Sequence, residues 1–227
     1  MILLRICVIY KGELHKRNCF VTSYIGSFRG ADIYKTELSE RLSRRRLLKC
    51  FKHLQSLGVS FVAAHEGMFS PSLLSRFSLT DVDATRALTS RIAEMALLFA
   101  RRVGAPLSFF IQGGSFSRVS EIALALLSET SHVAISCADA DAVCEALADA
   151  CGAVIRTSPI KESVDIFPTD PKALLRFGEL SAGFSDFSLS LPPDFPFDIP
   201  LPLHASLVSF FETFGVLKGD EAELKFS

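Results

Sequence analysis

The chain has 227 residues, of which 49% are hydrophobic, with 24 Lys and Arg against 25 Asp and Glu. This length allows one large or two small domains, and this hydrophobic content excludes a mainly disordered protein. No uncharged apolar run approaches the roughly 18 to 20 residues that a membrane-spanning helix needs. The opening MILLRICVIY also lacks the pattern of a cleaved signal peptide. We therefore expect a soluble, cytoplasmic protein with no membrane partner.

The charges are unevenly distributed along the chain. Residues 1–105 carry 17 Lys and Arg and 8 Asp and Glu, a net charge of +9, whereas residues 106–227 carry 7 and 17, a net charge of −10. Such complementary halves can face each other within the chain or across a homo-oligomer, or the basic half can meet an anionic ligand.

Six cysteines are scattered through the sequence without a C-x-x-C pair, which argues against a zinc ribbon, a thioredoxin-type motif and a secreted disulfide scaffold. No H-x-x-x-H, H-E-x-x-H or clustered carboxylates indicate a metal site, so we expect none. The thiols are expected to be reduced and mostly buried. They are Cys7, Cys19, Cys50, Cys137, Cys144 and Cys151.

An N-terminal segment, residues 1–58, is expected to hold strands and one basic helix. Residues 2–10 and 18–25 are rich in β-branched and aromatic residues, which predicts a β-hairpin, and IYKTEL predicts a short third strand. Ser39 is then the expected N-cap of a helix that ends at Gly58. Its apolar residues recur at three- and four-residue steps. They are Leu47, Cys50, Phe51, Leu54 and Leu57.

Residues 59–170 alternate between apolar strands and helices. The strands are expected in VSFVAAHEG, LSFFIQ, HVAISC, AVIRT and VDIFP, and a long helix is expected from Thr80–Asp83 to Val103. Two further helices are expected in SRVSEIALALLSE and ADAVCEALADAC. Such strands do not pair as hairpins, so we predict an α/β fold with a Rossmann-like parallel sheet and helices on both faces.

The remaining residues, 171–227, form a segment rich in Pro and Phe. Residues 184–204 contain five of the ten prolines, which excludes a helix or central strand there. The many apolar side chains predict an arm that covers the sheet edge, reaches back to the basic half or embraces a second subunit. A helix from about Ala205 to Phe214 and a short terminal strand are expected to follow.

The glycine turn after LSFFIQ is the main candidate binding site. A phosphate needs a turn without Cβ atoms and free N–H groups at a helix start, which Gly113, Gly114 and the next amides can supply. Ser115 and Ser117 add hydroxyls and Arg118 adds charge. The alternative is a simple strand-to-helix connection in which Ser115 or Ser117 only caps the helix.

Asp139 follows the next strand, where a carboxylate could accept the ribose hydroxyls of an adenosine or simply cap its own helix. With it, residues 106–157 resemble the first half of a Rossmann-type NAD(P)-binding domain. The glycine motif departs from G-x-G-x-x-G, because Gly113 and Gly114 are adjacent and no third glycine follows. The resemblance implies nucleotide binding at Gly113, Gly114, Ser115 and Asp139, with NAD or NADP as the cofactor, and implies no catalytic residue.

Two other features of the sequence are candidate sites. His65 and Glu66 end an earlier strand and form a candidate acid/base pair, the alternative being a histidine hydrogen-bonded to a neighbouring loop. Arg41, Arg45, Lys49 and Lys52 form a basic stripe on the N-terminal helix, which could contact nucleic-acid phosphates. No nucleic-acid-binding module accompanies the stripe, so a solvated face is the preferred interpretation.

These features predict a nucleotide- or dinucleotide-binding α/β protein, with an oxidoreductase as the enzymatic form of that hypothesis. This functional prediction depends on analogy with other proteins of the same fold, and such sheets host many different functions. The alternative is a non-catalytic regulatory or interaction module, and a third hypothesis is association with nucleic acid through the basic helix.

Overall fold

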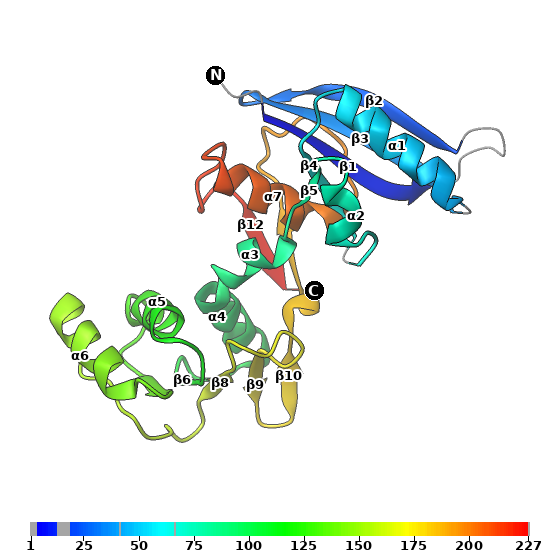
Figure 1. Cartoon of the computed structure of the whole chain (residues 1–227). Helices are drawn as coiled ribbons and strands as arrows, with labels where there is room; N and C mark the ends of the chain where they lie inside the picture. Colours follow the sequence, from blue (N-terminus) through cyan, green and yellow to red (C-terminus); the bar gives the residue numbers. More distant parts are fainter. Residues whose placement is uncertain (1–3, 13–18, 41, 66, 227) are drawn as a thin grey trace. The chain divides into compact units, whose positions relative to one another are not determined.

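The computed structural model describes residues 4–12, 19–40, 42–65 and 67–226. The chain forms two compact units, the first comprising Met1–Ala87 and Leu189–Glu223 and the second comprising Leu88–Ser188 and Leu224–Ser227. The chain therefore leaves the first unit and later returns to it (Figure 1). The boundaries expected from the sequence, after residues 58 and 170, differ from these.

The first unit contains a five-stranded sheet in the order β2-β3-β1-β4-β5. Its strands are β1 (Leu4–Gly12), β2 (Phe20–Phe28), β3 (Ala31–Ser39), β4 (Phe61–Ala64) and β5 (Thr80–Asp81). β1 pairs in parallel with both β3 and β4, and β5 pairs in parallel with β4. Four consecutive residues of β1, from Ile6 to Ile9, are fully buried, as is typical of a central strand covered on both faces.

The expected hairpin between the first two strands is wrong. β2 pairs in the antiparallel direction with β3, and the register shifts between Tyr24 and Gly26. β1 instead takes the central position between β3 and β4. Its continuous apolar run is buried on both faces, whereas β2 contains several exposed residues and lies at the sheet edge. The third strand expected in IYKTEL is confirmed as part of β3.

Helices cover both faces of this first sheet. They are α1 (Arg44–Ser56) and α2 (Pro71–Ser75) on one face and α7 (His204–Thr213), preceded by the turn η2 (Leu201–Leu203), on the other. Cys50, Phe51 and Leu54 of α1 are buried, as predicted. Ser39 is not the N-cap of α1, because β3 runs through that residue and Ser43 occupies the cap position.

The segment after residue 188 returns to the first unit. This is one of the three arrangements expected for the Pro- and Phe-rich segment, in which it reaches back to the basic half. Its apolar side chains join α7 in the core beneath the sheet. They are Leu191, Phe195, Phe197, Ile199 and Leu203. Arg29 donates to Glu221 at 2.6 Å and to Asp194 at 2.9 Å, which ties the β2–β3 turn to the same segment.

The second unit contains a sheet in the order β10-β9-β8-β6-β7. Its strands are β6 (Phe109–Gln112), β7 (Val133–Ser136), β8 (Val164–Ile166), β9 (Leu175–Phe177) and β10 (Leu180–Ala182). β6 pairs in parallel with β7 and β8, and Arg156 forms a further parallel bridge with Ala134 of β7. The parallel order is therefore Arg156, β7, β6, β8, which is the order of a Rossmann-like unit.

Several helices belong to this second part of the chain. They are α3 (Ala84–Thr89), which begins in the first unit, α4 (Ile92–Val103), α5 (Phe116–Leu127) and α6 (Ala140–Cys151). Residues 153–157 form only the bridge at Arg156 rather than the expected strand. A short turn η1 (Phe184–Asp186) precedes β11 (Phe187–Ser190), which pairs with β12 (Glu223–Phe226).

The structure corrects two expectations for residues 59–170. Their strands do not form one sheet, because β4 joins the N-terminal sheet and β6 to β8 form another. The long helix expected from Thr80–Asp83 is divided into α3 and α4. Thr80 lies in β5, while the Asp83 carboxylate accepts hydrogen bonds from the backbone amide and hydroxyl of Thr85, at 2.8 and 2.6 Å.

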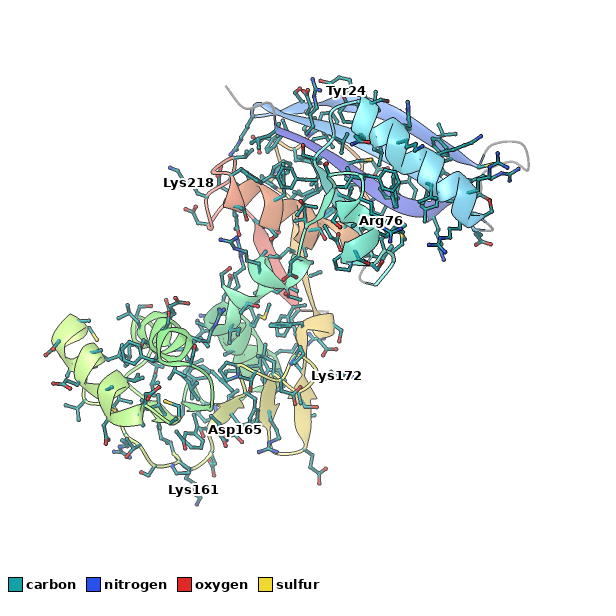
Figure 2. All side chains as sticks on the ribbon, viewed as in Figure 1. Tyr24, Arg76, Lys161, Asp165, Lys172 and Lys218 are labelled. Atoms are coloured by element: carbon teal, nitrogen blue, oxygen red, sulfur yellow. The ribbon has the colours of Figure 1, made fainter. Side chains whose placement is uncertain are left out.

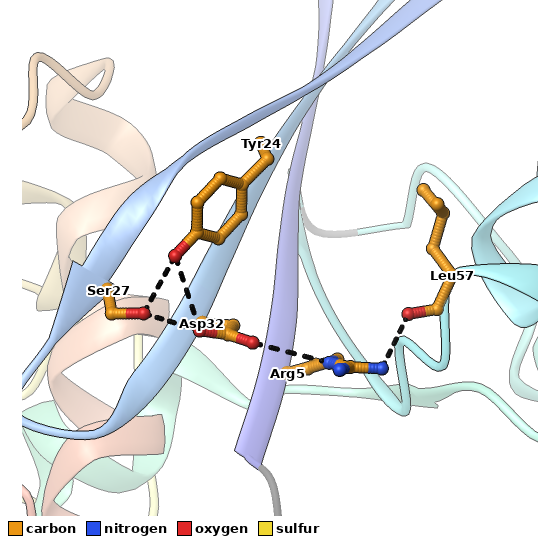
Figure 3. A network of polar contacts seen from close by, with 5 residues as sticks. All are labelled: Arg5, Tyr24, Ser27, Asp32 and Leu57. Atoms are coloured by element: carbon orange, nitrogen blue, oxygen red, sulfur yellow. Dashed lines mark hydrogen bonds and ion pairs between the residues drawn. The ribbon is translucent and has the colours of Figure 1, made fainter.

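A polar network joins three parts of the first unit (Figure 3). Asp32 of β3 accepts hydrogen bonds from the Ser27 and Tyr24 hydroxyls and from Arg5 at 3.3 Å. The Arg5 guanidinium also donates to the Leu57 carbonyl at 2.9 Å, where α1 ends. The hydrogen bond from Ser27 and the charge of Arg5 lower the pKa of Asp32 below its usual value.

This lowered pKa predicts a pH dependence of stability. A depressed carboxyl pKa stabilises the folded state above the unfolded pKa of about 3.9, and the contribution is lost as pH falls through the folded pKa. The free energy of unfolding should therefore fall more steeply in the wild type than in Asp32→Asn as pH drops from about 5 to about 3. Urea denaturation of both proteins measures this, and parallel pH profiles would contradict it.

Candidate functional site

The glycine turn lies between β6 and α5. Gly113 and Gly114 have φ angles of 73° and 96°, in the region that non-glycine residues rarely adopt. A Cβ atom on Gly113 would meet open space, whereas one on Gly114 would lie 3.2 Å from Val119 and 3.6 Å from Pro168. Gly114 therefore allows close contact of the turn with α5 and with the residues that follow β8, and a side chain at Gly113 would meet open space.

Five consecutive amides, from Gly114 to Arg118, have no hydrogen-bond acceptor within the described residues. The Gly113 amide, by contrast, donates to the Ser136 carbonyl at 2.7 Å. Ser115 is the N-cap of α5 in an extended conformation, and its side chain makes no cap hydrogen bond. No acidic residue occupies the first turn of α5, so its amides and positive dipole end are available to an anion.

Two residues expected to contact the phosphate have other partners. The Ser117 hydroxyl donates to the Glu121 carboxylate at 3.2 Å, one helical turn along α5. The Arg118 guanidinium donates to the Thr89 carbonyl at 2.9 Å. The backbone of the turn and the Ser115 hydroxyl are therefore the candidate anion-binding groups that have no other hydrogen-bond partner among the described residues.

Asp139 is the N-cap of α6 and is exposed. Its side chain makes no hydrogen bond to the first amides of α6, so no capping bond supports the alternative that Asp139 only caps this helix. β6 and β7 are parallel neighbours with Gln112 opposite Ser136, so the glycine turn and Asp139 follow the same ends of adjacent strands. The structure thus brings these two parts of the predicted site to one edge of the sheet.

At these carboxyl ends of the strands lies the point where the strand order reverses. The chain goes from β6 to β7 on one side, and later to β8 on the other side of β6. In open parallel sheets, ligands bind outside the carboxyl ends of the strands at such a point. Pro168, two residues after the end of β8, lies against the position of a Gly114 Cβ and forms one wall there.

His65 lies in the other unit. It follows β4, is exposed, and lines a cavity of about 530 Å³ with Lys11, Gly67 and Met68. Its ring makes no hydrogen bond to another described residue. Glu66, its expected acid/base partner, lies outside the described residues. β4 and β6 belong to different sheets, so His65 and the glycine turn do not follow neighbouring strands.

A wide cavity of about 880 Å³ on the second sheet was not expected from the sequence. Phe110 and Gln112 of β6 and Asp165 of β8 contribute to its lining, together with the loop before β8 and the β9–β10 turn. The Asp165 carboxylate forms an ion pair with the Arg176 guanidinium at 3.1 Å, and Asp165 is labelled in Figure 2. Asp165, a carboxylate within a short apolar strand, was a feature of the sequence that could have indicated this cavity. The other segments that line the cavity carry no motif.

The cysteines differ widely in exposure. Cys7 and Cys50 are fully buried, and burial raises the pKa of each thiol to about 12. Cys151 is exposed and the other three are partly exposed, so the expectation that the thiols are mostly buried is wrong. All six thiols are free.

These differences predict the order of thiol modification. A thiolate is the reactive form, so at pH 8 Cys151 should react with an aromatic disulfide reagent in the native protein. Cys7 and Cys50 should remain unmodified until the protein is unfolded in urea. Mass spectrometry of the labelled peptides measures this, and rapid native labelling of Cys7 would show that the central strand opens readily.

Within the described residues, no group of three or more His, Cys, Asp and Glu side chains is placed to hold a metal ion. Across residues 4–226, apart from those not described, no helix is both long and apolar enough to cross a membrane.

Comparison with known proteins found no matching family model and no matching curated protein. A solved shikimate 5-dehydrogenase-like protein is 11% identical with a TM-score of 0.26, over 73% of this chain and 65% of that one. Quinate dehydrogenase from Corynebacterium glutamicum, in complex with NAD, is 14% identical with a TM-score of 0.24, over 72% and 64%. The chain thus spans less than two thirds of each. At TM-scores this low, the likeness carries no argument about cofactor or substrate.

Proposed function

We propose that the second unit binds a nucleotide or dinucleotide through its phosphate at the glycine turn. The supporting observation is the run of free amides from Gly114 to Arg118, at the start of a twelve-residue helix and at the reversal point of a parallel sheet. Backbone amides and the helix dipole favour an anion at such a position. Gly113 leaves space for the ligand beside them.

The residues of the turn fit NAD or NADP in part. The amides and the Ser115 hydroxyl would hold the phosphates, and the Asp139 carboxylate would accept ribose hydroxyls. Ser117 and Arg118 would contribute only if their present hydrogen bonds to Glu121 and Thr89 were exchanged. A bound nicotinamide would supply hydride-transfer chemistry.

A thermal-shift screen of the full chain tests the proposal. The panel contains NAD, NADP, their reduced forms, ATP, GTP, S-adenosylmethionine and coenzyme A. A ligand at about a hundredfold excess over its dissociation constant stabilises by roughly 2.7 kcal/mol, which is visible as a shift of several degrees. A folded protein that responds to none of these would contradict nucleotide binding and favour the interaction-module alternative.

A further inference from the structure

The outer face of α1 carries an uncompensated group of cations. Its five Lys and Arg side chains are exposed, and the helix contains no acidic residue. None of them has an ion pair or a hydrogen bond to another residue of the described ranges. The five, here called the α1 basic face, are Arg44, Arg45, Arg46, Lys49 and Lys52.

This arrangement is costly for an isolated helix. Arg44, Arg45 and Arg46 occupy the first turn of α1, where the positive end of the helix dipole disfavours cations. Like charges one turn apart, such as Arg45 and Lys49, also repel each other. An anionic partner would offset both terms, so the basic face is better explained by contact with one than by solvation alone.

α6 presents the opposite charge on its own outer face. Asp141, Glu145 and Asp149 are exposed and follow one another at intervals of four residues, and α6 contains no Lys or Arg. The exposed residues around them include Ala142 and Ala148, whose small side chains leave the carboxylates projecting. These carboxylates have no ion pair to any described residue. The three are here called the α6 acidic face.

The two faces match in length and spacing. Helical residues four apart lie about 6 Å apart along the axis, so the row from Asp141 to Asp149 spans about 12 Å. Arg45, Lys49 and Lys52 form a row of nearly the same length on α1. Opposed rows of this kind allow several charge pairs to form together, and the small side chains of Ala142 and Ala148 do not obstruct close approach of the helices.

We propose that the α1 basic face of one copy of this chain docks on the α6 acidic face of a second copy. Both faces belong to the described part of the chain, and no ion pair joins either of them to a described residue of its own unit. Exposed ion pairs are individually weak, which predicts a low-affinity association that salt dissociates. The proposal is independent of nucleotide binding, because the glycine turn belongs to neither face.

Sedimentation of the full-length protein at high micromolar concentration tests the association. The wild type should self-associate at about 0.02 M salt and become monomeric at about 0.5 M, where the screening length falls to a few ångströms. Arg45→Glu with Lys49→Glu should weaken self-association by roughly tenfold or more, because both faces are then negative. Glu145→Lys with Asp149→Lys should do the same, because both are then positive.

Mixing the two variants is the most direct test of the proposed contact. The reversed α1 face of the first variant complements the reversed α6 face of the second, so the mixture should associate although neither variant does alone. Arg101→Glu with Arg102→Glu, an equal charge change on exposed residues of α4, is the matched control and should associate like the wild type. A monomeric wild type at low salt, or a mixture that stays monomeric, overturns the proposal, as does RNA binding by a monomer.

Discussion

Replacing Phe211 with alanine should lower the free energy of unfolding of the first unit by about 3 to 5 kcal/mol. Phe211 of α7 is fully buried, and its ring centroid lies 5.4 Å from that of Phe28 in β2 and 6.0 Å from that of Phe195. The substitution therefore leaves a cavity where the returning C-terminal segment meets the N-terminal sheet. Urea denaturation followed by circular dichroism measures the loss.

Phe214→Ala is the control for this prediction. Phe214 directly follows α7, but 40% of its surface is exposed, so its removal should cost much less than that of Phe211. Equal and small losses for the two variants would mean that the C-terminal segment is not an integral part of the first unit.

Gly114→Val should destabilise the second unit by about 2 to 4 kcal/mol, through backbone strain together with overpacking. The φ angle of 96° is unfavourable for a β-branched residue, and the new side chain would press on Val119 and Pro168. Thermal denaturation measures the change. This variant cannot report on ligand binding alone, because its effect on the fold comes first.

Gly113→Ala separates strain from crowding. A Cβ on Gly113 meets no atom within 4 Å, so only the conformational cost of its φ angle of 73°, about 1 kcal/mol, should appear. Equal losses at Gly113 and Gly114 would contradict the close contact of Gly114 with α5 and the end of β8.

Local elements were the most predictable part of this fold. β6, α5, β7 and α6 were expected where they occur, because apolar runs, turn glycines and helical periodicity are written in short stretches of sequence. Gly104 and Gly152 end their helices in left-handed conformations, as expected of such positions. The buried stripe of α1 was also predictable from its spacing.

Strand pairing was less predictable because it depends on contacts between distant segments. The first two strands looked like a hairpin, but β1 is apolar enough to be buried between β3 and β4. β4 resembles the later parallel strands in sequence, yet it joins the N-terminal sheet. The return of the chain after residue 188 was one of three open possibilities, and only its contacts with the first unit distinguish them.

The candidate site shows the same division. The glycine turn and its position before α5 follow from local sequence, and the sheet order explains why Asp139 follows a neighbouring strand. The hydrogen bond of Ser117 to Glu121 could be predicted from their spacing of four residues on a helix. The hydrogen bond of Arg118 to Thr89 could not, because these residues are far apart in the sequence. That β4, which precedes His65, joins the N-terminal sheet could not be predicted without knowing which strands pair.

The central claim, that a nucleotide phosphate binds at the glycine turn, is tested most directly by calorimetric titration of two Ser115 variants with the ligand that gives the largest thermal shift. Aspartate and asparagine are both good N-cap residues, so Ser115→Asp and Ser115→Asn should leave α5 intact. Only aspartate places a negative charge against the phosphate, and like-charge contact costs several kcal/mol.

We expect Ser115→Asp to bind at least roughly a hundredfold more weakly than wild type, with Ser115→Asn within about tenfold of it. The thermal stability of both variants without ligand is the control for folding. Equal affinities for Ser115→Asp and Ser115→Asn would contradict the claim and place the ligand elsewhere on the protein.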